Sequence, residues 1–189
     1  METLRERPLS NGGVLRLVHG DITAQAVDAI VNAANSHLAH GGGVAAVIAR
    51  KGGRVVWEQS RRWVQEHGPV PHDCPAYTSC GNLPCRYIIH AVGPVWHGGH
   101  DDEDAKLRAA VQGALQRAEA LGLTSIAFPA ISTGIYGFPK GRAAEVFYRA
   151  IADYFAVHPQ SPLRDVRLVL YDRPTLEAFL AVWDAGDAA

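Results

Sequence analysis

Three short segments combine glycines with small polar residues, the residue types best suited to hold an anionic ligand through backbone N–H groups. They are Gly20-Asp21-Ile22-Thr23, residues 32–44 with Gly41-Gly42-Gly43, and residues 129–139. Three consecutive glycines lose much backbone entropy on ordering, which indicates close approach of a ligand at the start of a helix. Ser, Thr and Gly between a strand and a helix can surround phosphate oxygens with N–H groups. Each segment alone is a weak signal, because a turn without a ligand has a similar composition.

The glycines form neither of two common nucleotide-binding motifs. The segment Gly41-Gly42-Gly43-Val44 matches neither the dinucleotide fingerprint G-x-G-x-x-G nor the phosphate loop, which ends in Gly-Lys-Ser/Thr. The sequence therefore disfavours a Rossmann-type or phosphate-loop nucleotide enzyme.

Among the ionisable residues near these segments, Asp21 has two possible roles. Its side chain can cap the turn that follows, or it can accept a hydrogen bond from a ligand amine; the residue alone favours the cap. His40 has an ordinary pKa suited to proton transfer near neutral pH, but it could equally face solvent beside the glycines. His90 lies in the middle of an expected strand, which predicts a buried, hydrogen-bonded histidine.

The three cysteines, Cys74, Cys80 and Cys85, do not have the paired short spacing of common structural zinc sites, so we expect no metal. An odd number of cysteines without a signal peptide indicates a reducing compartment rather than a disulfide framework. Residues 1–11 are polar and lack the apolar core of a signal peptide, and no apolar stretch approaches the roughly 20 residues that span a bilayer. We therefore expect a cytoplasmic protein that does not enter the membrane.

The charge balance also restricts the partners. The chain has 18 Lys and Arg against 19 Asp and Glu, a formal net charge of −1. A near-neutral chain without a basic stripe disfavours a nucleic-acid partner. The acidic run 101–104 precedes an apolar helical pattern and is interpreted as a solvated helix start.

Strand and helix patterns alternate along the whole chain. We expect strands at residues 14–19, 27–31, 76–80, 87–92, 125–131 and 166–171, and helices from the glycines to about residue 52 and at 55–67, 107–121, 139–155 and 174–183. This alternation predicts an α/β fold with helices on both faces of one sheet. We expect a single domain over residues 1–189, with a core of about 14–185 and a flexible N-terminal segment at 1–12.

Taken together and in this order, the motifs resemble those of macrodomains. The matching segments are Gly20–Thr23, Val27–Asn35, His40–Val44, Ile88–Pro94 and Pro129–Gly137. The resemblance covers the chain from about residue 14 to its end. It implies a three-layer α/β/α sandwich with a central mixed sheet, and an ADP-ribose ligand in a cleft across the strand ends. No cofactor is implied.

The resemblance also assigns roles to residues at the two ends of that cleft. Asp21 accepts a hydrogen bond from the adenine amino group, with the backbone of Ile22 also contacting the base, which replaces the simple cap. Tyr171 stacks on adenine, although an ordinary tyrosine at a strand end is the alternative. Asn35 contacts the distal ribose, and Asn32 shapes the same loop.

By the same resemblance, the glycine segment and residues 129–139 contact the middle of the ligand. Gly42, Gly43 and Val44 line the distal ribose and the diphosphate. The diphosphate is surrounded by Ser132, Thr133, Gly134, Ile135 and Tyr136, and Tyr136 also packs over the distal ribose. No lysine or arginine is evident in these loops, so backbone N–H groups and helix dipoles are expected to offset the phosphate charge.

The residue after the Gly-Val step bears on enzymatic activity. Many hydrolytic macrodomains carry an acid just after the Gly-Val step, where this chain has Ala45. We expect a mono-ADP-ribosyl hydrolase that acts on glutamate or aspartate esters by positioning a water with Asn35, Gly43 and Tyr136. O-acetyl-ADP-ribose and ADP-ribose 1″-phosphate are alternative substrates, and a non-catalytic ADP-ribose reader is the alternative function. The expected partner is ADP-ribose or an ADP-ribosylated protein, bound by a stand-alone monomer of bacterial type.

Overall fold

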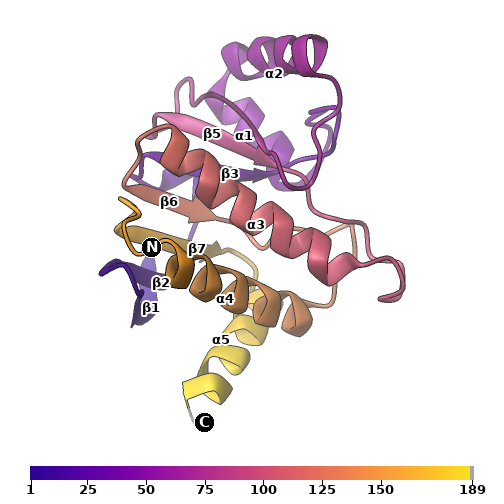
Figure 1. Ribbon diagram of the computed structural model, residues 1–189. Helices are drawn as coiled ribbons and strands as arrows, with labels where there is room; N and C mark the ends of the chain where they lie inside the picture. Colours follow the sequence, from indigo (N-terminus) through magenta and orange to yellow (C-terminus); the bar gives the residue numbers. More distant parts are fainter. Residues whose placement is uncertain (188–189) are drawn as a thin grey trace.

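Seven strands form one mixed sheet in the order β1-β2-β7-β6-β3-β5-β4. The computed structural model describes residues 1–187 of the chain (Figure 1). The strands are β1 (Glu2–Pro8), β2 (Val14–His19), β3 (Ala29–Ala33), β4 (Ala76–Ser79), β5 (Tyr87–Ala91), β6 (Ser125–Phe128) and β7 (Asp165–Leu170). The five inner strands run parallel to one another, and the two edge strands, β1 and β4, are antiparallel to their neighbours. All five inner strands therefore end at the same edge of the sheet.

Helices cover both faces of the sheet, as the alternating pattern predicts. They are α1 (Gly43–Gly52), α2 (Arg54–His67), α3 (Glu103–Ala120), α4 (Lys140–Val157) and α5 (Arg173–Asp187), with a short 3-10 helix η1 (Ile22–Ala24) after β2. Figure 1 shows α3 and α4 in front of the sheet and α1 behind it. The predicted three-layer α/β/α sandwich with a mixed central sheet is confirmed.

Alternating strand residues supply the two halves of the core. In β3, Val31 packs into the larger apolar cluster beneath α3, α4 and α5, and Ile30 packs into a second cluster with α1 and α2. Both residues are at most 1% exposed. Burial on both faces is typical of parallel strands and explains their nearly continuous apolar sequences.

The expectation of a flexible segment at residues 1–12 is wrong for most of its length. Residues 2–8 form the edge strand β1, which pairs with β2 from Glu2↔His19 to Pro8↔Val14. Its sequence contains little apolar signal because most of it stays exposed, and charged residues are common on edge strands. An ion pair between Arg5 and Asp184 of α5, at 2.9 Å, attaches the strand to the last helix.

The expectation of no disulfide is also wrong. Cys80 and Cys85 are bonded across the turn between β4 and β5, and Cys74 is free and exposed. The antiparallel pairing of β4 with β5 brings the two residues together, which the cysteine count could not reveal. The cysteines therefore no longer indicate a reducing compartment.

The acidic run at 101–104 is likewise more than a solvated helix start. Glu103 is buried and accepts hydrogen bonds from the backbone N–H groups of His97, Asp101 and Gly99, at 2.7, 2.6 and 2.9 Å. Burial alone would raise the pKa of its carboxyl group, but these N–H groups lower the pKa to about 2. Glu103 therefore holds the loop before α3 as an ionised carboxylate.

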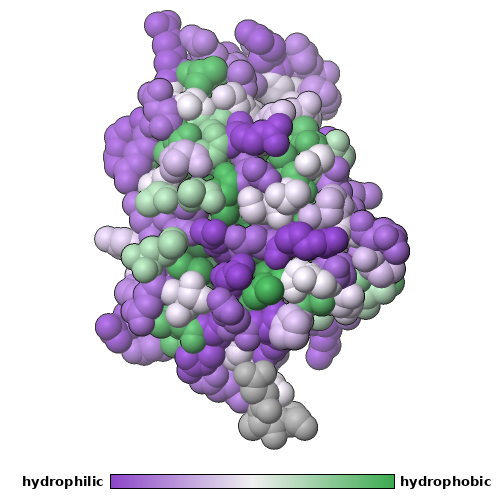
Figure 2. Space-filling view, turned by 90° about the vertical axis from the view of Figure 1, so that its left-hand side faces the viewer, coloured by the Kyte–Doolittle hydropathy of each residue, from purple (hydrophilic) through white to green (hydrophobic). Residues whose placement is uncertain are grey.

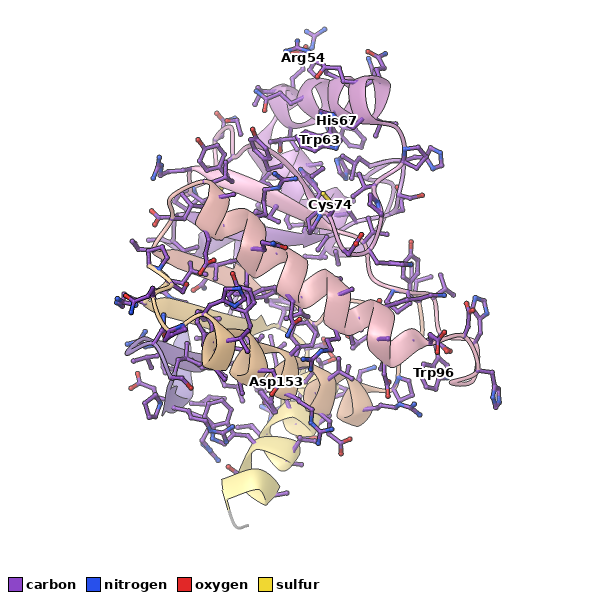
Figure 3. All side chains as sticks on the ribbon, in the orientation of Figure 1. Arg54, Trp63, His67, Cys74, Trp96 and Asp153 are labelled. Carbon is purple, nitrogen blue, oxygen red and sulfur yellow. A yellow bond between two sulfur atoms is a disulfide. The ribbon has the colours of Figure 1, made fainter. Side chains whose placement is uncertain are left out.

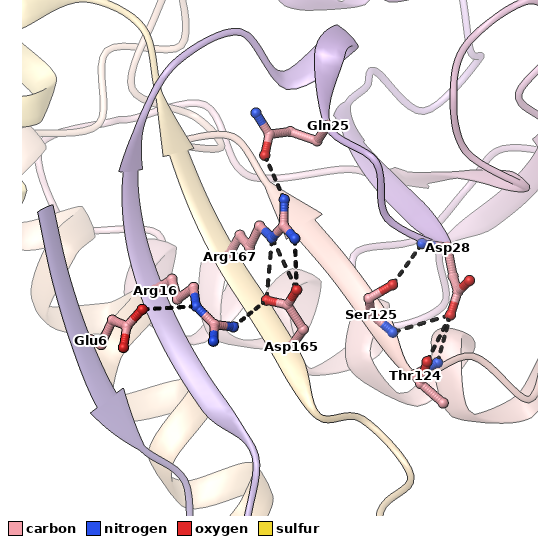
Figure 4. A network of polar contacts seen from close by, with 8 residues as sticks. All are labelled: Glu6, Arg16, Gln25, Asp28, Thr124, Ser125, Asp165 and Arg167. Carbon is pink, nitrogen blue, oxygen red and sulfur yellow. Dashed lines mark hydrogen bonds and ion pairs between the residues drawn. The ribbon is translucent and has the colours of Figure 1, made fainter. Parts of the chain in front are cut away.

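The edge of the sheet where the parallel strands begin is held by polar side chains (Figure 4). Asp165, at the start of β7, accepts hydrogen bonds from Arg16 and Arg167 at 2.9 and 2.8 Å. Asp28 binds the backbone N–H of Thr124 at 2.9 Å, which ties the start of β3 to that of β6. The strand arrows of Figure 1 start near this side, and Figure 2 shows it mostly hydrophilic, with hydrophobic residues in small separate groups. Among residues 1–187, no large apolar patch is visible on this side of the molecule.

Candidate functional site

A cavity of about 970 Å³ lies across the carboxyl ends of the inner strands. Its wall includes residues that follow β2, β7, β6, β3 and β5, namely Asp21, Tyr171, Ala130, Asn35 and Gly93. Since β2, β7, β6, β3 and β5 are successive neighbours, these residues follow strands that span four strand spacings, about 19 Å. In open α/β sheets this edge is where ligands bind.

The structure places twelve of the thirteen predicted ligand-binding residues on this cavity. They are Asp21, Ile22, Asn35, Gly42, Gly43, Val44, Ser132, Thr133, Gly134, Ile135, Tyr136 and Tyr171. Asn32 is the exception, because it is fully buried in β3 and does not line the cavity.

At the β2 end of the cavity, Asp21 is both a cap and an exposed carboxylate. Its Oδ1 accepts from the backbone N–H and the hydroxyl of Thr23, at 2.8 and 2.6 Å, and its Oδ2 lies 3.2 Å from Lys51 Nζ. The Thr23 hydroxyl is the largest cause of a lowered pKa for Asp21, and Lys51 lowers it further. The side chain is 42% exposed. An ionised oxygen is therefore available to accept a hydrogen bond from a ligand.

Two cationic side chains, which the sequence analysis missed, also line the cavity. Arg50 and Lys51 lie in the last turn of α1, and α1 begins at the glycine loop. Val44, Val47 and Lys51 follow one another at helical spacing along the cavity wall. That spacing from Val44 was the available signal for Lys51. Phosphate charge in this cavity can therefore be offset by side chains as well as by N–H groups.

The glycine loop leads directly into the N-terminus of α1. Gly42 is extended, with φ −167°, and provides no side-chain cap for the helix. Gly43 has φ +59°, a conformation that favours glycine. A Cβ added at Gly41, Gly42 or Gly43 would meet nothing within 4 Å. The N–H groups of the first helical turn are thus left without a side-chain cap, beside open space where an anion is stabilised.

Asn35 holds the loop between β3 and the glycines. Its side-chain Nδ2 donates to the carbonyl of Ala39 at 2.7 Å, and its Oδ1 accepts from the N–H of Ala39 at 2.9 Å. The amide therefore clamps this loop while it also lines the cavity.

The loop after β6 supplies the opposite wall. Ser132 has φ +68° and is 6% exposed, and its Oγ has no hydrogen-bond partner among the described residues. Gly93 lies against it, so closely that a side chain at position 93 would collide with the Ser132 hydroxyl. Ile135 is 92% exposed at the rim, and Tyr136 is half-buried. This turn is strained at Ser132, packed closely against Gly93, and carries a hydroxyl available for a ligand. Such a turn is suited to binding an anionic group.

Trp96 supports this wall from outside the cavity. Its backbone N–H donates to the carbonyl of Tyr136 at 2.8 Å, and Arg142 of α4 lies 5.0 Å from the centre of its ring. Figure 3 shows Trp96 next to the first turn of α3, near the loop that Glu103 holds. The position of Tyr136 therefore depends on the segment between β5 and α3.

The β7 end of the cavity has an exposed aromatic ring. Tyr171 is 79% exposed, and its carbonyl lies 3.2 Å from His19 Nε2. The next residue, Asp172, also lines the cavity and accepts from the N–H and hydroxyl of Thr175, in the first turn of α5. Burial opposes ionisation of Asp172, but the bonds from Thr175 keep its pKa lowered. A flat ligand group at this end could stack on Tyr171 close to the Asp21 carboxylate.

Neither His40, the histidine considered for proton transfer, nor His90 lines the cavity. His40 is 2% exposed, with Nε2 2.9 Å from the Ser60 hydroxyl, and burial lowers its pKa. His90 is fully buried between Asn32 and Thr78, and burial, with a smaller effect of His40, lowers its pKa to about 3. The buried, hydrogen-bonded His90 is confirmed, and a solvent-facing His40 is wrong.

The only carboxylates among the cavity-lining residues are Asp21 and Asp172, both near the Tyr171 end and both already accepting hydrogen bonds. Position 45, at the glycine end, is an alanine. Any hydrolysis here must therefore proceed without a side-chain carboxylate base at the glycine end. Within residues 1–187, no group of three or more His, Cys, Asp or Glu side chains is arranged to hold a metal ion, and no helix is long and apolar enough to cross a membrane.

Known proteins share this sequence and this architecture. A Thermotoga maritima protein is 50% identical over 179 residues, which cover 95% of this chain but only 30% of the relative's own length. A Cronobacter sakazakii protein named O-acetyl-ADP-ribose deacetylase is 43% identical over 160 residues, 85% of this chain and 88% of the relative. The solved structure of the Oceanobacillus iheyensis macrodomain with ADP superposes with a TM-score of 0.89 at 29% identity, covering 97% of this chain and 96% of the other. The sequence model of the Macro domain matches residues 31–147. The chain belongs to the macrodomain family.

Proposed function

We propose that this protein binds ADP-ribose in the cavity at the strand ends and hydrolyses esters of its distal ribose. The observation that supports this best is the distribution of groups along the cavity. The Asp21 carboxylate and the exposed Tyr171 ring lie at one end. The rest of the cavity is lined by the loops at residues 41–43 and 132–136 and by the N-terminus of α1, which has no side-chain cap. This order matches a base, a diphosphate and a sugar.

At the base end, adenine stacks on Tyr171 and its amino group donates to Asp21 Oδ2. Lys51 Nζ, now 3.2 Å from that oxygen, shares it with the base or turns toward the phosphates. Because the carboxylate is ionised and buttressed by Thr23, it discriminates against a base with an acceptor in place of the amine. Ile22 contacts the base through its backbone.

In the middle, the diphosphate lies between the loop at Ser132–Tyr136 and the start of α1. The helix dipole and the N–H groups of Gly43 and Val44 stabilise its charge. The unpartnered Ser132 hydroxyl donates to a phosphate oxygen. Arg50 and Lys51 add a screened, longer-range attraction.

Hydrolysis is proposed to need no side-chain base. A water held between a phosphate oxygen and the Asn35 amide attacks the distal ribose carbon of the ester. The carbon–oxygen bond to the acyl group breaks, and the products are ADP-ribose and the free carboxylic acid. Tyr136 packs over the sugar and holds it in line with the water. Positioning and fixed dipoles then provide the rate enhancement.

Two ester classes fit this site, each with its own point of water attack, and a purely binding function is the competing proposal. The name of the Cronobacter relative favours O-acetyl-ADP-ribose as the first substrate to test, where attack would fall on the acetyl carbonyl and release acetate. ADP-ribosyl esters of glutamate or aspartate side chains are the second. Ala45, in place of the acid of many hydrolytic members, is the observation that favours a reader.

The test measures binding and turnover in parallel. Calorimetry with ADP-ribose is combined with chromatography of O-acetyl-ADP-ribose and of a glutamate-modified protein, for wild type, Asn35→Ala and Gly42→Glu. We expect the wild type to bind and release product, Asn35→Ala to lose release, and Gly42→Glu to lose both because its side chain enters the cavity. Binding without release of either ester would leave a reader. No binding of ADP-ribose would refute both functions.

A further inference from the structure

A chain of buried polar side chains lies between the sheet and α2, outside the cavity. From one end to the other it consists of Ser60, His40, Asn32, His90 and Thr78. The His40 Nε2 lies 2.9 Å from the Ser60 hydroxyl, and the His90 Nε2 lies 2.9 Å from the Thr78 hydroxyl. Asn32 Nδ2 lies between the two rings, 3.0 Å from His90 Nδ1 and 3.5 Å from His40 Nδ1.

Every member of this chain is removed from solvent, since none is more than 3% exposed. The two imidazole rings are stacked with their centres 5.3 Å apart, and Trp57 of α2 contacts His40 edge-on at 5.1 Å. The Oδ1 of Asn32 is buried without a partner among the described residues. Apolar side chains at these positions would avoid the desolvation cost of so many polar groups, so their presence calls for a role other than packing.

One end of this chain is attached to the glycine loop and the other end is not. His40 directly precedes Gly41-Gly42-Gly43, whereas Thr78 lies on the edge strand β4. The glycines have no side chains with which to fix their own path, and on the other side the Asn35–Ala39 clamp ends one residue before His40. The His40 ring is therefore the last side-chain attachment before the N–H groups at the start of α1.

We propose that His40 is a positioning residue for the glycine loop: held by Ser60 and Asn32, its buried ring sets the point from which residues 41–43 enter the cavity. This role rests on the proposed function, because the loop is taken to bind the diphosphate and distal ribose. His40 itself touches no ligand. Loss of its anchor leaves the loop free to sample other paths and weakens binding at that end of the ligand only.

Two matched variants test the role. Ser60→Ala and Thr78→Val each remove one buried hydroxyl at 2.9 Å from a histidine Nε2, at the loop-attached and unattached ends of the chain. Both should lower the melting temperature by similar amounts. Ser60→Ala should weaken ADP-ribose binding about fivefold to tenfold, the loss of one hydrogen bond, while Thr78→Val stays within about twofold of wild type. AMP, which lacks the distal ribose and one phosphate, should bind both variants as it binds the wild type.

A third variant, at His40 itself, guards the test against an effect of misfolding. His40→Asn retains a polar atom near the place of Nδ1 but cannot reach Ser60, so it should lose ADP-ribose affinity as Ser60→Ala does. Wild-type affinity in Ser60→Ala, or an equal loss in Thr78→Val or for AMP, would overturn the positioning role while leaving the proposed function intact. Failure of the wild type to bind ADP-ribose would overturn the proposed function and this role with it.

Discussion

Asp21 divides its two carboxylate oxygens between structure and ligand. Oδ1 is bonded twice to Thr23, and Oδ2 faces Lys51 and the cavity. A single residue thus serves as the cap that its sequence context favours and as the acceptor that the family resemblance implies. The two interpretations are compatible because they use different atoms.

The substitution Asp21→Asn should separate these two roles. The new amide keeps an oxygen for the Thr23 N–H but can present an NH₂ group to the adenine amine, so two donors face each other. We expect ADP-ribose affinity to fall by on the order of 1–3 kcal/mol, tenfold or more, with little change in stability. Asp21→Ala should lose a similar affinity and also about 1 kcal/mol of stability from the missing cap. Calorimetry and urea unfolding of both variants measure the difference, and unchanged affinity in both would contradict the adenine contact.

At the scale of single residues, the sequence indicates which residues line the cavity better than it indicates what surrounds each side chain. Apart from Tyr171, the predicted cavity residues lie in three motifs whose glycines and polar residues are recognisable along the chain. Lys51 and Asp172 were missed because they reach the cavity only through the path of α1 and the end of β7. The burial of His40 could not be predicted because it depends on α2 packing over β3.

Among the structural elements, the glycine loop and α1 act as one unit, since Gly43 is the first residue of the helix. Gly42 and Gly43 both border open space but differ in backbone conformation: only Gly43 has a positive φ. Substitutions at these two glycines therefore distinguish a loss of space for the ligand from backbone strain.

We expect Gly42→Ala to weaken ADP-ribose binding about tenfold by placing a methyl group in ligand space, with stability changed by no more than about 0.5 kcal/mol. Gly43→Ala should in addition lose roughly 1–2 kcal/mol, because alanine is strained at a φ of +59°. Thermal unfolding and calorimetry on the same samples distinguish the two effects. A Gly42→Ala variant that binds normally would mean that the ligand does not approach this loop.

The turn between β4 and β5 is stapled by the Cys80–Cys85 disulfide, with a sequence separation of 5. So short a loop loses little chain entropy, and the chain-entropy relation gives about 2 kcal/mol of stabilisation. Reduction with dithiothreitol should lower the free energy of unfolding by that amount in wild type and in Cys74→Ser, and should leave a Cys80→Ser, Cys85→Ser double variant unchanged. If dithiothreitol lowered the free energy of unfolding of the double variant equally, the effect would not come from this disulfide.

The elements themselves were largely predictable, and the exceptions have physical causes. Apolar runs bounded by glycine, proline and polar residues indicated six of the seven strands and all five α-helices. Strand β1 was missed because an exposed edge strand lacks an apolar face. Its partner could not be inferred from local pattern, since pairing to β2 and the contact with α5 depend on tertiary structure.

The whole molecule should lose stability as pH falls through the histidine range. His90 has a pKa of about 3 in the fold, against about 6.5 in the unfolded chain, so the unfolded chain takes up the proton first. The stability is fully present above pH 6.5 and is lost progressively as pH falls toward 3. His40, whose pKa is also lowered by burial, acts in the same direction.

Between about pH 6.5 and 5, His90 alone should reduce the free energy of unfolding by about 2 kcal/mol. Urea unfolding at about pH 7, 6 and 5 measures this loss, and a His90→Gln variant should show a smaller slope. Carboxylates with lowered pKa, such as Glu103, contribute only below about pH 4.5 and so fall outside this window. A flat wild-type profile would contradict a neutral buried histidine pair.

The cavity wall is assembled from residues as far apart in the chain as Gly20 and Thr175. No fragment of the chain holds all of these loops, so a ligand of this cavity has almost nothing to bind in the unfolded state. Ligand binding therefore raises the free energy of unfolding, by about 2.7 kcal/mol when the free ligand is at about 100 times its Kd. In the cell, a higher concentration of such a ligand would then slow proteolysis of the protein. The amount of this protein would rise and fall with the amount of its ligand.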